Sequence, residues 1–81
     1  MTVVVLAFAR IREVVGAATL ARDVPANATA GDLWATLARE FPELAPLRRS
    51  TRLARGGTLI DAATLLCEGD ELALLPPFGG G

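Results

Sequence analysis

The sequence predicts one α+β domain in which a mixed β-sheet carries a single main helix on one of its faces. The chain has 81 residues, a length that suits one domain. Its segments follow the order β-β-α-β-β-β, with strand-like patterns around one strongly amphipathic helical pattern. The first and last strand segments are the most apolar, so we expect them to lie side by side and parallel in the middle of the sheet.

The N-terminal elements are two predicted strands with a short helix between them. Val3–Ala9 is β-branched and apolar on both faces, as is usual in a central strand. Arg10–Val15 can form a turn or two of helix, which Gly16 ends because glycine readily adopts the left-handed conformation. Thr19–Val24 alternates loosely and stops at Pro25, so an N-terminal hairpin with a wide loop is expected.

The main helix has the clearest local signals in the chain. Thr29 and Asp32 have the spacing of a capping box, and Pro42 stops the helix. The apolar residues that recur at helical spacing between these signals are Leu33, Trp34, Leu37, Ala38 and Phe41. The pattern predicts an amphipathic helix of roughly 12 residues that buries its apolar stripe, Trp34 and Phe41 included, in the core.

The second half of the chain predicts a hairpin followed by the last strand. Pro42–Ser50 is a connection in which Glu43–Leu47 can form a short helical turn. Thr51–Arg55 and Thr58–Asp61 flank a Gly-Gly pair, which is typical of a β-hairpin. Glu71–Leu75 is the last predicted strand.

The end of the sequence is rich in proline and glycine. Pro76 and Pro77 end the last strand and would stiffen the chain that leaves it. The next residues are Phe78, Gly79, Gly80 and Gly81. We expect residues 1–77 to form the domain and residues 78–81 a flexible tail, whose small glycines could enter a narrow channel in another protein.

Composition and charge exclude several classes of function. The net charge of −1 provides no basic field for nucleic acid, and no apolar run is long enough to span a bilayer. The chain has no histidine and no lysine, so the usual zinc ligand sets and Schiff-base chemistry are excluded, and no metal or bound cofactor is expected. Its single cysteine, Cys67, is expected to be a buried or half-buried structural thiol. Without a signal-peptide pattern, the expected location is cytoplasmic.

An apolar patch is expected on the sheet because one helix can cover only one of its two faces. The expected members of this patch are Phe8, Leu6, Leu59, Ala73 and Leu75. Loops that cover this face and make it ordinary core are the alternative. Four arginines in the second half, Arg48, Arg49, Arg52 and Arg55, form either a solvated face or a docking surface for an acidic groove.

Three segments together resemble a known family. Val5–Gly16, with its Ala-Arg-Ile-Arg-Glu run, and Thr29–Leu33 match the opening strand and the start of the helix. Glu68–Gly81 matches an ending of Gly-Asp-Glu, an apolar strand, Pro-Pro and Gly-Gly. In these segments the chain resembles the small, sulfur-carrying subunits of molybdopterin synthase, often called MoaD, which have the ubiquitin-like β-grasp fold. It departs from them in its Ala54–Gly57 turn, in a third terminal glycine and in Phe78.

The resemblance implies a function and a set of partners. An E1-like enzyme (MoeB-like) would use ATP to adenylate the carboxylate of Gly81, and sulfur transfer would convert it to a thiocarboxylate. The tail would then enter the large subunit (MoaE-like) and donate sulfur to precursor Z in molybdopterin biosynthesis. The chain would not be catalytic alone, and the apolar sheet face would contact both partners. A related carrier for thiamine, cysteine or tRNA thiolation, and a β-grasp interaction module without a carrier role, remain as alternatives.

Overall fold

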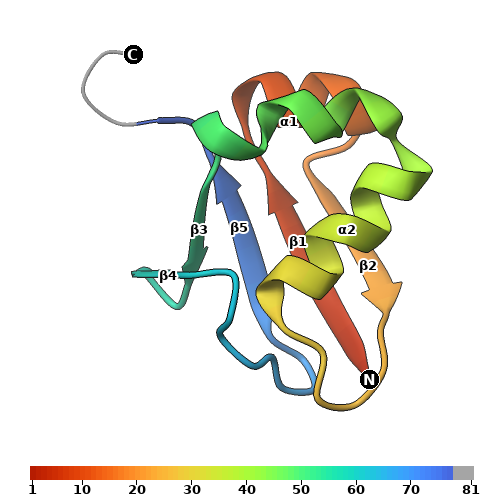
Figure 1. The fold of residues 1–81 in the computed structure, drawn as a ribbon, viewed down its shortest axis with the longest axis vertical. Coiled ribbons are helices and arrows are strands. Elements are labelled where there is room, and N and C mark those ends of the chain that lie inside the picture. Colours follow the sequence, from red (N-terminus) through yellow and green to blue (C-terminus); the bar gives the residue numbers. More distant parts are fainter. Residues whose placement is uncertain (78–81) are drawn as a thin grey trace.

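A mixed five-stranded sheet forms the body of the chain in the computed structural model, which describes residues 1–77 (Figure 1). The strand order is β2-β1-β5-β3-β4, with β1 and β5 parallel and the other neighbouring pairs antiparallel. The strands are β1 (Thr2–Ala7), β2 (Thr19–Asp23), β3 (Arg52–Arg55), β4 (Thr58–Ile60) and β5 (Glu71–Leu75). This confirms the predicted α+β class and the central parallel pair.

The helices of the described chain are α1 (Ala9–Val15), α2 (Ala30–Glu40) and the 3-10 helix η1 (Pro42–Ser50). The capping box of α2 forms as predicted. The Asp32 amide donates to Thr29 Oγ1 at 3.1 Å, and the Thr29 amide donates to Asp32 Oδ2 at 2.9 Å. The helix ends before Pro42, where the Phe41 amide still donates to the Leu37 carbonyl oxygen.

The first strand is shorter than predicted. It ends at Ala7, Phe8 becomes the N-cap of α1, and Ala9 turns the chain with φ 50°, a left-handed value that is uncommon for a residue other than glycine. Gly16 ends α1 in the left-handed conformation, as predicted. The Pro42–Ser50 connection differs from the prediction too, because it is helical over its whole length and not only at Glu43–Leu47.

The core lies between the sheet and α2, which crosses one sheet face (Figure 1). From the sheet, Val3 and Val5 of β1 and Leu72 and Leu74 of β5 are fully buried. The helix contributes Leu33 and Leu37, equally buried, and Trp34, which confirms the predicted stripe. Phe41 is half-buried at the edge of this core. Burial of such side chains is the main stabilising contribution in a small domain.

The loop before β5 is held by one carboxylate. Asp70 Oδ2 accepts from Arg55 Nη1 at 3.0 Å and from the Cys67 amide at 2.8 Å. The same guanidinium nitrogen donates to the Leu65 carbonyl oxygen at 2.8 Å. Arg55 is therefore a structural residue of this loop. The expectation for Cys67 was wrong, because its turn leaves the residue exposed while only its backbone is anchored.

An ion pair joins β2 to the end of α2. Arg22 Nε donates to Glu40 Oε2 at 2.9 Å, and Arg22 Nη2 donates to Glu40 Oε1. The hydrogen bond from Arg22 and its positive charge lower the pKa of Glu40 below its ordinary value. Within residues 1–77 no helix has both the length and the apolar character needed to cross a membrane.

Candidate functional site: the open sheet face and the root of the tail

A row of small and apolar side chains crosses the sheet on the face away from α2. Leu6 of β1 pairs with Ala73 of β5, and Ala73 pairs with Ala54 of β3. Ala54 in turn pairs with Leu59 of β4. Because paired residues point to the same face of a sheet, residues from four strands form one continuous apolar strip.

This strip forms the floor of a hollow of about 400 Å³, called the sheet hollow below. Its lining residues are Leu6, Ala54, Gly56, Gly57, Leu59, Glu71, Ala73 and Leu75. Leu59 is 54% exposed, while Leu6, Ala73 and Leu75 are half-buried. Both residues of the β3–β4 turn, Gly56 and Gly57, line the hollow, and their left-handed φ of 57° and 80° are conformations that glycine adopts readily.

Charged side chains stand at the two ends of the sheet hollow. Glu71 begins β5 and is exposed, and it is the one charged residue in the lining. Arg52 pairs with Leu75 at the other end of the strand and is also exposed. The surface is therefore apolar in the middle, acidic at the start of β5 and basic where β5 ends.

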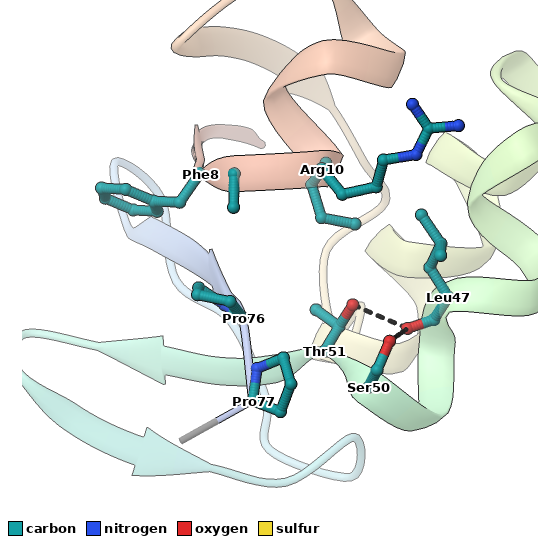
Figure 2. Close-up of a pocket in the computed structure, with 9 residues that line it drawn as sticks. Phe8, Arg10, Leu47, Ser50, Thr51, Pro76 and Pro77 are labelled. Carbon is teal, nitrogen blue, oxygen red and sulfur yellow. Dashed lines mark hydrogen bonds between the residues drawn. The ribbon is translucent and has the colours of Figure 1, made fainter. Parts of the chain in front are cut away.

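A smaller cavity of about 60 Å³ lies at the root of the tail, where Pro76 and Pro77 follow β5 (Figure 2). The β1–α1 turn and η1 form its other walls, with Phe8 and Leu47 among the lining residues. Thr51 Oγ1 donates to the Leu47 carbonyl oxygen at 2.7 Å and Ser50 Oγ at 3.1 Å, which fixes the end of η1 beside the prolines. Phe8 is 43% exposed at this end of the sheet.

The predicted site residues fall into three groups. Leu6, Leu59, Ala73 and Leu75 come together in the sheet hollow, whereas Phe8 lines the cavity at the tail root. The residues predicted for the tail, Phe78, Gly79, Gly80 and Gly81, lie outside the described residues. A role of any of these groups in binding or sulfur transfer stays a prediction.

Sequence reasoning missed Ala54 and the Gly56-Gly57 turn as parts of the hollow. Strand alternation alone does not reveal them, because membership depends on how β3 pairs with β5. The Gly-Gly pair predicted a turn, but its place in the lining of the sheet hollow depends on the tertiary arrangement. The lining offers an apolar contact surface with one carboxylate, that of Glu71, at its edge.

Comparison with known proteins finds a matching family model and similar sequences. The family model described as "ThiS family" matches residues 5–81. A molybdopterin synthase sulfur carrier subunit from Drosophila yakuba is 40% identical over 80 residues, covering 95% of this chain and 88% of that protein.

Solved structures have the same fold. SAMP1 from Haloferax volcanii aligns with a TM-score of 0.86 at 30% identity, with 100% of both chains covered. A chain from a complex of subunits 1 and 2 of molybdopterin-converting factor from Helicobacter pylori aligns with a TM-score of 0.71 at 28% identity, again with 100% of both chains covered.

Proposed function

Because the chain belongs to the ThiS family, we propose that it is the sulfur-carrying small subunit of a molybdopterin synthase. The observation that carries the proposal is the 40% identity to a molybdopterin synthase sulfur carrier subunit over 95% of this chain. That identity extends over an entire domain with an apolar, open sheet face and a strand that leads directly into the Pro-Pro-Phe-Gly-Gly-Gly sequence.

The reactive group in this proposal is the carboxylate of Gly81. A carboxylate is a poor electrophile, so an E1-like partner first joins it to the α-phosphorus of ATP and releases pyrophosphate. Sulfur at the sulfide level (HS⁻) then attacks the carbonyl carbon, AMP leaves with the electron pair of the C–O bond, and a thiocarboxylate remains. The chain itself binds no cofactor in this scheme, and ATP is used by the activating partner.

The large subunit is the second proposed partner. The thiocarboxylate sulfur attacks an electrophilic carbon of precursor Z and displaces an oxygen leaving group from that carbon. Water then attacks the carbonyl carbon of Gly81 and cleaves its bond to sulfur, which restores the carboxylate and leaves the sulfur bonded to the precursor. Acid and base groups come from the large subunit, since the carrier has neither histidine nor lysine. The Helicobacter pylori complex of subunits 1 and 2, which contains a chain of this fold, supports a partner of this kind.

Access to a partner's active site explains the residues at the end of the sequence. Glycines have no side chains, so Gly79, Gly80 and Gly81 fit a narrow channel. Two prolines restrict the backbone at the base of the tail and direct it away from the sheet. Phe78 lies between the prolines and the glycines. We assign Phe78, Gly79 and Gly80 to threading of the tail, and Gly81 to carrying the reactive group.

Mass spectrometry of the protein purified from its native host tests the carrier function. We expect a species that is heavier by the mass difference between sulfur and oxygen, with the change located at Gly81. Deletion of Gly81 should abolish sulfur transfer and leave the thermal midpoint unchanged. A truncated chain that still supports product formation would contradict the mechanism.

The co-purifying partner distinguishes this pathway from other sulfur-carrier pathways. A large molybdopterin synthase subunit recovered with the tagged chain supports the proposal. Recovery of a thiazole synthase in its place would assign the chain to thiamine biosynthesis and reject the molybdopterin pathway.

A further inference from the structure

We propose that Arg52 and Glu71 determine the direction in which the large subunit docks across the sheet hollow. This inference rests on the proposed function and adds the chemistry of the partner surface to it. The expected partner places a carboxylate opposite Arg52, apolar side chains in the hollow and a basic group opposite Glu71.

The two charges occupy opposite ends of the same surface. Arg52 pairs with Leu75, the last residue of β5, whereas Glu71 is the first residue of that strand. Four residues of extended chain separate the two positions by about 13 Å. The apolar residues Leu6, Ala73 and Leu59 lie between them.

Both side chains are available for contact with another protein. Within residues 1–77, Arg52 and Glu71 are exposed, and neither takes part in an ion pair or a side-chain hydrogen bond. Arg55, three residues further along β3, is different because its guanidinium is bonded to Asp70. Since Arg55 stabilises the fold, Arg52 is the arginine of β3 that remains for recognition.

Direction matters because the tail begins beside only one of these charges. Pro76 follows Leu75 directly, so the strand pair places Arg52 next to the tail root. A partner docked in the reverse direction would bring like charges together at both ends and would send the tail away from its active site. Such repulsion disfavours wrong orientations more strongly than it changes the total affinity.

Charge-reversal variants and the large subunit encoded by the same organism test the inference. Association rate constants are measured by surface plasmon resonance over a series of salt concentrations. We expect Arg52→Glu and Glu71→Arg each to slow association by about tenfold at low salt and to make the rate less salt-dependent. Arg52→Gln is a milder variant with a smaller expected effect, and circular dichroism verifies that every variant folds.

Arg39→Glu is the matched control. Arg39 is an exposed arginine of α2, which packs on the opposite face, and its side chain bonds only to Thr36 within the described chain. Arg39→Glu changes the net charge by the same amount as Arg52→Glu, and we expect it to change the association rate constant by less than about twofold. Equal slowing by Arg39→Glu and Arg52→Glu would overturn the inference, because net charge alone would then explain both.

Two other outcomes reject the inference for different reasons. A free protein that forms dimers, which Arg52→Glu converts to monomers in analytical ultracentrifugation, would show that a second copy occupies the hollow. Wild-type protein that fails to bind the large subunit would overturn the proposed function together with the inference. Normal binding that neither charge reversal affects would overturn the inference alone.

Discussion

The two faces of β5 differ although their residues alternate one by one along the strand. Leu72 and Leu74 are fully buried beneath α2, whereas Ala73 and Leu75 are half-buried and border the sheet hollow. Neighbouring β1 repeats the difference, with Val5 buried and Leu6 on the open face. One strand thus contributes buried side chains to the core on one side and half-buried side chains to the open apolar surface on the other. This explains why the chain is 52% apolar although a domain of its size has a small core.

The largest expected effect is a loss of stability from a change on the sheet face that α2 covers. Leu74→Ala removes a fully buried side chain and leaves a cavity, so the free energy of unfolding should fall by about 2–5 kcal/mol. Urea denaturation monitored by circular dichroism measures the change. If Leu74→Ala had no effect, the division between a stabilising face and a binding face would be incorrect.

A smaller loss of stability is expected from a change at Asp70, whose carboxylate holds the loop before β5. Asp70→Asn weakens hydrogen bonds from Arg55 and from the Cys67 amide, and hydrogen bonds to charged groups contribute about 1.5–3 kcal/mol in proteins. Because Asp70 is partly exposed, the loss should lie at or below the lower end of that range. Hydrogen exchange should show faster opening of residues 61–70. Protection unchanged from wild type would mean that Asp70 does not hold this loop.

A substitution on the open face should have the opposite effect to Leu74→Ala, with little change in stability and a loss of affinity. Leu59→Ala shortens an exposed side chain, so the free energy of unfolding should change by less than about 0.5 kcal/mol. Affinity for the large subunit should fall by about tenfold, which corresponds to about 1.4 kcal/mol. Isothermal titration calorimetry and urea denaturation of the same variant measure both quantities. A variant that loses stability and keeps its affinity would reverse the assignment of the two faces.

The smallest effect concerns the Arg22–Glu40 pair, which lies away from the hollow. Its hydrogen bond and charge lower the pKa of Glu40 in the folded state. A carboxyl of this kind adds stability above its unfolded pKa of about 4.3 and loses it as the pH falls through the folded pKa. Wild type should therefore be slightly more stable than Glu40→Gln at neutral pH, and the two should converge once the pH falls below the folded pKa of Glu40. Urea denaturation across this pH range measures the difference, and a gap that widens in acid would contradict the pairing.

Local signals in the sequence predicted much of the fold. The capping box of Thr29 and Asp32 formed as its spacing indicated, and Gly16 ended α1 as expected. Each of these features depends on interactions between a few neighbouring residues, so a short segment of sequence is enough to predict it. The parallel pairing of β1 and β5 was also predictable, because their apolar character on both faces required central positions.

Features that depend on contacts between distant segments were predicted less well. Ala54 entered the hollow through the register of β3 with β5, and Arg55 was bound by Asp70 from a different loop. Cys67 was expected to be a buried or half-buried structural thiol, but its turn exposes it. Phe8 was expected in the apolar patch by alternation along β1. It is exposed as expected, but the strand ends before it and Ala9 turns the chain, so Phe8 lines the cavity at the tail root.

Reconstituted sulfur transfer tests the central claim most directly. The full chain, prepared with a thiocarboxylate at Gly81, is mixed with the large subunit and precursor Z without any other sulfur source, and molybdopterin is measured. We expect product in proportion to the thiocarboxylate supplied and none from the same chain with a carboxylate at Gly81. Equal product from both forms, or none from the thiocarboxylate form within an intact complex, would contradict the proposed function.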